Sequence, residues 1–162
     1  MQAVMSVLVR ALVILAVWAS VGVVANLVSP AGIPWIYVQA KTIEVSGITV
    51  ALIDVNEARK LYDDGQTVFV DARNQQDYTR GSVRGSVFLF PDDIHERFVA
   101  VQTLLPENSP IVLYCYGPEC DMAERVAEFL GQLGYKKMLI MTDGFSAWER
   151  AGYPVTRPSA QQ

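Results

Sequence analysis

The stretch PIVLYCYGPECDMAERVAEFLGQLG, from Pro110 to Gly134, decides how this chain folds. Its continuous apolar run, Ile111–Tyr114, predicts a buried strand. The loop that follows carries Cys115 and Cys120, the only two cysteines of the protein. A helix comes next, because apolar residues recur at helical spacing: Ala123, Val126, Ala127, Leu130 and Leu133. We therefore expect a strand, a short loop and an amphipathic helix, with a cysteine at the strand-to-helix turn.

Further strands and helices alternate on both sides of this stretch. Short apolar runs predict strands over 67–73, 86–90 and 137–141. A helix is predicted between Asp54, with Glu57 as its capping-box partner, and Gly65 as its end. Two more helices are predicted over 91–105 and 144–152. This alternation predicts an α/β fold with a mostly parallel sheet that helices cover on both faces.

The charge distribution separates the chain into two parts. No charged residue occurs from Ala11 to Ala40, whereas the part from Lys41 onward holds 12 basic and 17 acidic residues. An acidic domain without a basic cluster is poorly suited to binding a phosphate backbone. Nucleic acid is therefore excluded as a partner.

The N-terminal part predicts a membrane anchor. Ala11–Ser29 is a nearly continuous apolar run of 19 residues, close to the length that crosses a bilayer as a helix. A signal sequence cleaved after Ala25 stays open as the alternative. The predicted organisation is an anchor or signal over 1–29, a linker over 30–45, a folded domain over 46–157 and a tail over 158–162. Basic groups before the run outweigh Lys41 after it, which favours a single-pass protein with its domain on the extracytoplasmic (periplasmic) side.

Cys115 is the leading candidate for chemistry. In a parallel sheet, ligands bind beyond the carboxyl ends of the strands. A helix N-terminus there offers free N–H groups and partial positive charge, which favour a thiolate or a bound anion. The alternative is an inert, buried cysteine.

Three stretches of the domain, in order, resemble one family. They are Val70–Arg73 followed by Asp77 and Gly81 to Gly85, then Val112–Cys115, and then Gly144–Val155. Together they resemble the rhodanese-like (sulfurtransferase) family over about residues 48–155. The resemblance implies a three-layer sandwich with a central five-stranded parallel sheet flanked by helices.

The resemblance also implies a reaction and its residues. Cys115 would take sulfane sulfur from a small donor, such as thiosulfate, and pass it as a persulfide to a thiol acceptor, either a small molecule or a protein. Asp71 and Arg73 match positions that support the site. The substrate-binding loop would consist of Tyr116, Gly117, Pro118, Glu119, Asp121 and Met122. No cofactor is expected, and no metal, since two cysteines and the single His95 fall short of a zinc site.

The loop departs from the family pattern in its charge. Met122 stands where the family commonly has an arginine, and Glu119 and Asp121 add negative charge that disfavours an anionic donor. Ser82 replaces the family's histidine. Without the arginine, the phosphatase relatives of this fold are excluded.

The second cysteine is the other departure. The YCxGxxC pattern from Tyr114 to Cys120 resembles a membrane-attached subgroup of the family. Cys120 is predicted as a resolving thiol; it could instead pack beneath the loop or form a structural disulfide. Three functions stay open: a sulfurtransferase, a thiol-disulfide oxidoreductase or redox sensor that uses both cysteines, and a non-catalytic rhodanese-like binding module.

Overall fold

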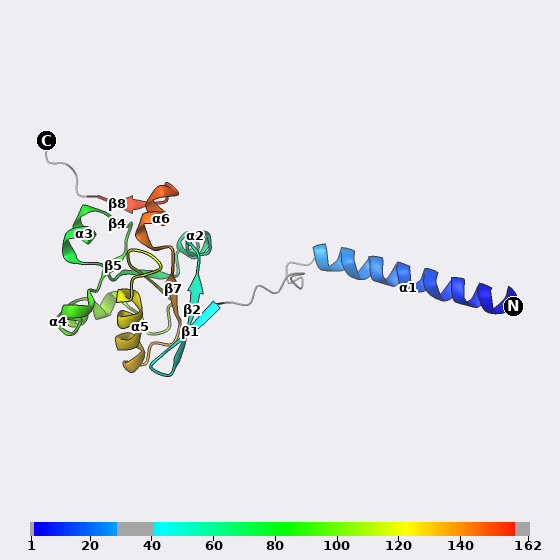
Figure 1. Ribbon diagram of the computed structural model, residues 1–162, viewed down its shortest axis with the longest axis horizontal. Helices are drawn as coiled ribbons and strands as arrows, with labels where there is room; N and C mark the ends of the chain where they lie inside the picture. Colours follow the sequence, from blue (N-terminus) through cyan, green and yellow to red (C-terminus); the bar gives the residue numbers. More distant parts are fainter. Residues whose placement is uncertain (1, 29–40, 158–162) are drawn as a thin grey trace. The chain divides into compact units, whose positions relative to one another are not determined.

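The computed structural model describes residues 2–28 and 41–157, in two compact units over 1–39 and 40–162 (Figure 1). The described part of the first unit is one helix, α1 (Gln2–Val28), of 27 residues. The predicted linker lies outside the described residues as far as position 40, and the predicted tail lies wholly outside them.

Helix α1 corrects the prediction of a membrane anchor. The prediction relied on the uncharged run from Ala11 to Ser29, whereas the helix begins at Gln2 and includes Arg10. Among the described residues, no helix has both the length and the apolar character that crossing a bilayer requires. The predicted single-pass membrane protein, with its domain on the extracytoplasmic side, is therefore wrong.

The second unit is built on a six-stranded sheet with the strand order β1-β2-β7-β6-β3-β5. Five strands run parallel: β2 (Ile48–Ile53), β7 (Met138–Met141), β6 (Ile111–Tyr114), β3 (Val68–Asp71) and β5 (Val87–Phe88). Strand β1 (Lys41–Val45) pairs antiparallel with β2. The sheet is therefore mixed, and the prediction of a purely parallel five-stranded sheet is wrong.

A tight hairpin explains the additional strand. Ser46 and Gly47 connect β1 to β2 and both have positive φ, at 49° and 80°. Two residues in this conformation make a turn whose twist matches that of the flanking strands. The signal is present in the sequence, where Ser-Gly separates two β-branched runs.

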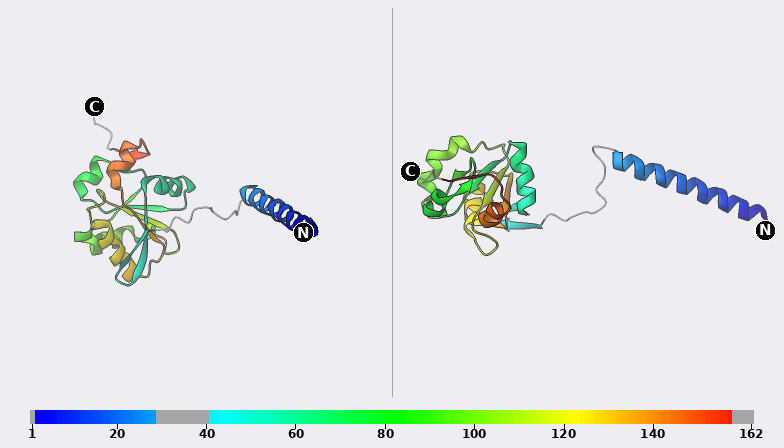
Figure 2. Two further views of the ribbon diagram at one scale, coloured as in Figure 1. Left: turned by 45° about the vertical axis from the view of Figure 1, so that its right-hand side comes forward. Right: turned by 90° about the horizontal axis from the view of Figure 1, so that it is seen from above.

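Helices cover both faces of the sheet (Figure 2). On one side, α2 (Val55–Asp64) and α6 (Gly144–Arg150) contact each other and enclose a cluster around the fully buried Trp148. On the other side, α5 (Met122–Gln132) and α4 (Ile94–Val101) enclose a larger cluster. The α/β fold itself was predicted correctly.

Strand β6 contributes to both clusters, as a central strand must. Ile111 and Leu113 belong to the α5 side, whereas Val112 and Tyr114 belong to the α6 side. Successive side chains of a strand point to opposite faces, so a continuous apolar run is the pattern of a strand covered on both. This is why the run before Cys115 predicted its strand correctly.

The remaining elements are short. They are α3 (Gln75–Arg80), the antiparallel pair β4 (Ser82–Val83) and β8 (Val155–Thr156), and the 3₁₀ turns η1 (Pro91–Asp93) and η2 (Gln102–Leu104).

Candidate active loop

Cys115 directly follows β6, the strand in the middle of the parallel set, and is 3% exposed. It forms a disulfide with Cys120, across a Cα–Cα distance of 6.4 Å. The turn between them is closed by the amide of Cys120, which donates to the carbonyl of Gly117 at 3.1 Å. The loop therefore folds back so that its second sulfur reaches the first.

Helix α6 supports this loop from the side. The amide of Phe145 donates to the carbonyl of Cys115 at 2.9 Å. Gly144 has φ 68°, and a Cβ there would collide with the backbone of Tyr116 and Gly117. Position 144 must therefore be glycine for two reasons, a left-handed conformation and a close approach of two backbones.

Tyr116 is held by two side chains at the start of α3. Its hydroxyl donates to Asp77 Oδ2 at 2.6 Å and accepts from Asn74 Nδ2 at 2.7 Å. Burial raises the pKa of the Tyr116 hydroxyl, and the carboxylate of Asp77 raises it further. The same hydrogen bond lowers the pKa of Asp77. This pair joins the loop to an element about 40 residues earlier in the chain.

Asp71 and Arg73 form a buried ion pair at the end of β3. Arg73 Nη2 lies 2.6 Å from Asp71 Oδ2 and also donates to the carbonyl of Gly81 at 2.6 Å. Burial would lower the pKa of the Arg73 guanidinium, but the hydrogen bonds and charge of Asp71 outweigh it and raise that pKa. The guanidinium carbon also lies 4.0 Å from the ring centroid of Phe145. Arg73 thus joins the end of β3, the residue that ends α3 and the ring of Phe145 in α6, and its charge is already neutralised by Asp71.

The loop surrounds a hollow of about 600 Å³, lined by the seven residues Tyr116–Met122. No basic side chain is among these described lining residues, and Glu119 and Asp121 are exposed. Met122 is half-buried and packs against the core cluster on the α5 side. Where the family commonly has an arginine, this loop therefore has an apolar residue directed into the core.

The N-terminus of α5 faces this loop without a side-chain cap. Asp121 occupies the N-cap position, but its carboxylate accepts no capping hydrogen bond. The first amides of a helix lack partners within the helix, so they are available to an anion in the loop. Within residues 2–28 and 41–157, no group of three or more His, Cys, Asp or Glu side chains is placed to hold a metal ion.

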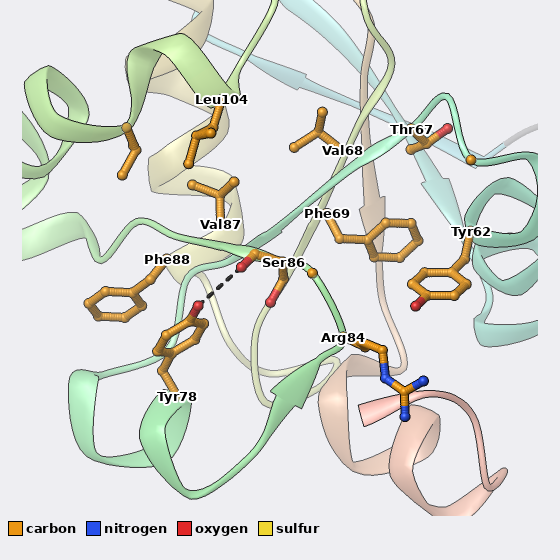
Figure 3. Close-up of a pocket in the computed structure, with 13 residues that line it drawn as sticks. Tyr62, Thr67, Val68, Phe69, Tyr78, Arg84, Ser86, Val87, Phe88 and Leu104 are labelled. Atoms are coloured by element: carbon orange, nitrogen blue, oxygen red, sulfur yellow. Dashed lines mark hydrogen bonds between the residues drawn. The ribbon is translucent and has the colours of Figure 1, made fainter. Parts of the chain in front are cut away.

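A second hollow, of about 690 Å³, lies near the outer edge of the sheet, where β3 and β5 meet (Figure 3). Its walls are mainly aromatic and aliphatic, and the hydroxyl of Tyr78 donates there to the carbonyl of Ser86 at 3.1 Å. Neither cysteine nor any predicted site residue is among the described residues that line it. The larger hollow is therefore separate from the loop chemistry.

All the predicted loop residues lie together around the hollow, and the two predicted supporting residues meet in one ion pair. Three residues that hold the loop were missed as site residues: Asn74, Asp77 and Gly144. Asn74 caps α3 by accepting from the amide of Asp77, and an Asn followed three residues later by an acidic residue is a recognisable start signal. That signal marks a helix start, but nothing in it shows that the same two side chains bind Tyr116.

A family model described as a rhodanese-like domain matches residues 54–151. The chain belongs to the rhodanese-like domain family. The match includes both cysteines, the Asp71–Arg73 pair and the start of α6.

This chain is similar in sequence to proteins from a bacterium and a plant. The "Uncharacterized protein YibN" of Escherichia coli strain K12 is 26% identical over 108 residues, which is 67% of this chain and 73% of that protein. The "Rhodanese-like domain-containing protein 17" of Arabidopsis thaliana is 30% identical over 124 residues, 70% of this chain and 78% of that protein. The Arabidopsis thaliana protein is named for the same domain, and neither name states a reaction.

Solved structures support the fold. The rhodanese-like domain of the Alr3790 protein from Anabaena has a TM-score of 0.56 at 18% identity, over 68% of this chain and 83% of that one. The BH2092 protein from Bacillus halodurans has a TM-score of 0.55 at 21% identity, over 65% and 75%. At these identities the likeness concerns the fold alone.

Replacing Gly144 by alanine should destabilise the protein through both strain and overlap. A non-glycine residue with positive φ costs about 1–2 kcal/mol, and overpacking against the Tyr116–Gly117 backbone adds about 1–3 kcal/mol. Gly152→Ala is the matched control, because Gly152 has φ 72° but open space around its Cβ position. Urea unfolding should show a larger loss for Gly144→Ala, and equal losses would contradict the close approach.

Arg73→Met should lower the free energy of unfolding by about 3–5 kcal/mol, because it leaves the carboxylate of Asp71 buried without its cation. Arg157→Met is the control, since the Arg157–Glu149 pair is exposed and such pairs contribute at most about 1 kcal/mol. The double variant Asp71→Asn, Arg73→Met should recover part of the loss. Denaturant titration of the four proteins checks this, and a loss for Arg73→Met no larger than for Arg157→Met would contradict it.

Proposed function

We propose that this protein is a sulfurtransferase that carries sulfane sulfur as a persulfide on Cys115. The observation that carries the proposal is the position of Cys115: it ends a central parallel strand and enters a loop that faces the N-terminus of α5. Membership of the rhodanese-like family supports the same reading.

The proposed reaction begins from the reduced protein. The Cys115 thiolate attacks the outer sulfur of a donor R–S–SH, the S–S bond of the donor breaks, and the thiolate RS⁻ leaves. The product is the Cys115 persulfide, from which an acceptor thiolate can take the outer sulfur. A helix N-terminus stabilises a thiolate or persulfide anion by its free amides and its dipole.

Charge in the loop favours some donors over others. The exposed carboxylates of Glu119 and Asp121 border the hollow, and Arg73 is neutralised by Asp71. A doubly charged anion such as thiosulfate would therefore be repelled, because like charges in a partly shielded site disfavour each other. We expect singly charged or neutral persulfides and polysulfides to be better donors.

A second candidate function is supported by the disulfide itself. Two thiols that can bond to each other at a sequence separation of 5 suit a thiol-disulfide oxidoreductase or a redox sensor. In the disulfide form Cys115 has no thiolate, so oxidation would also switch the sulfurtransferase off.

Incubation of the reduced Cys120→Ser variant with inorganic polysulfide should add the mass of one sulfur atom, and a further Cys115→Ser substitution should abolish the addition. Intact-protein mass spectrometry after removal of the donor measures this, because Cys120→Ser keeps the nucleophile and lacks the second thiol. If no sulfane donor labels either the wild type or Cys120→Ser, the sulfurtransferase is rejected and a non-catalytic binding module takes its place.

Equilibration with mixtures of a reduced and an oxidised dithiol should interconvert the two cysteines between the thiol and disulfide forms. Alkylation of free thiols followed by mass spectrometry counts them at each ratio. The oxidoreductase or sensor predicts a midpoint within the range of cellular thiol pools, about −180 to −320 mV. A pair that stays oxidised at every ratio in that range would be a structural disulfide instead.

A further inference from the structure

We propose that Cys120 discharges the Cys115 persulfide, so that the loop releases hydrosulfide and ends as the Cys115–Cys120 disulfide. This inference rests on the proposed persulfide chemistry and gives it a product. The site would then be a persulfide reductase centre, in which the sulfane sulfur is reduced rather than handed on intact.

Cys120 lies within bonding reach of Cys115. Its sulfur is bonded to that of Cys115 while the turn is closed by the Cys120–Gly117 hydrogen bond. The loop is also attached at Cys115 through Phe145 and at Tyr116 through Asn74 and Asp77. An anchored loop that already brings the two sulfurs together gives the internal thiol a high effective concentration over any thiol in solution.

Burial of Cys115 also favours Cys120 over a thiol from solution. Cys115 is 3% exposed, and it belongs to the core cluster on the α5 side, against which Cys120 also packs. A side chain this buried gives an acceptor from solution little access to its inner sulfur. Cys120 is itself part of the lining of the hollow and its sulfur is bonded to that of Cys115, so it is the thiol best placed to attack the inner sulfur.

The negative charge of the loop favours release of hydrosulfide. No basic side chain is among the described residues that line the hollow, so only backbone amides there can pair with the outer sulfur of a persulfide anion. The carboxylates of Glu119 and Asp121 instead border the space into which hydrosulfide would leave. A site of this charge holds an anionic persulfide less firmly than a cationic one and favours loss of an anion.

Discharge of the Cys115 persulfide by Cys120 needs no external oxidant. The Cys120 thiolate attacks the inner sulfur of Cys115–S–SH, a Cys115–Cys120 bond forms, and the bond to the outer sulfur breaks. The outer sulfur leaves with the electron pair as hydrosulfide. The two cysteines are oxidised to the disulfide, and the sulfane sulfur is reduced to sulfide.

Two classes of reaction must therefore accompany this site. One supplies a persulfide or polysulfide, and the other supplies a thiol or dithiol reductant that reopens the disulfide. Disulfide reduction would thus be an obligatory step of each turnover, because Cys115 has no thiolate while bonded to Cys120.

A single-turnover experiment on the full chain tests the inference. The reduced protein is mixed with one equivalent of glutathione persulfide and quenched at intervals with an alkylating reagent. The wild type should yield one hydrosulfide per chain together with the intramolecular disulfide. Cys120→Ser should accumulate the Cys115 persulfide and release hydrosulfide at least about ten-fold more slowly.

The outcomes separate the inference from the function on which it rests. If Cys120→Ser and the wild type release hydrosulfide at the same rate, or if the wild-type persulfide persists beside a free Cys120, the inference is overturned and the sulfurtransferase stands. If Cys120→Ser forms no persulfide, the proposed function fails and the inference fails with it. Cys115→Ser serves as the control for hydrosulfide released by the donor alone.

Discussion

The hydrogen bond from the amide of Phe145 to the carbonyl of Cys115 is the contact on which the arrangement of the loop depends. It requires α6 to begin beside the end of β6, and that approach is open only because residue 144 has no side chain. The same phenyl ring of Phe145 lies against Arg73, whose guanidinium is paired with Asp71 and bonded to Gly81. Loop, helix and sheet edge therefore form one connected support for the cysteine.

The Asp71–Arg73 ion pair within this support affects the charge of the site. Arginine at position 73 is close to the loop, yet its charge is used within the fold, by Asp71 on one side and a carbonyl on the other. The loop itself contributes two exposed carboxylates. A site that would normally offer a free cation to its substrate here offers backbone amides and a second thiol, which suits sulfur chemistry with weakly charged donors.

Much of this could be predicted from the sequence because the signals are local. The apolar run before Cys115 determined a strand covered on both faces, and the spacing of Ala123, Val126 and Leu130 determined the helix that follows. Contacts between residues far apart in the chain could not be predicted in this way. The pattern of Asn74 and Asp77 indicates only the start of a helix, and nothing near them in the chain indicates that both bind the hydroxyl of Tyr116. The hairpin at Ser46–Gly47 has a local signal, Ser-Gly between two β-branched runs. The uncharged run from Ala11 predicted a membrane anchor wrongly, because no helix among the described residues has the length and apolar character to cross a bilayer.

The central claim is that Cys115 accepts the sulfur and that Cys120 lies within reach of it. A crystal structure of Cys120→Ser soaked with polysulfide would test this most directly, by anomalous scattering at a wavelength sensitive to sulfur. The account predicts an additional sulfur atom on Cys115, within the hollow lined by Tyr116–Met122, with the Phe145–Cys115 hydrogen bond intact. A Cys115 that stays unmodified after the soak, while the loop keeps its conformation, would contradict it.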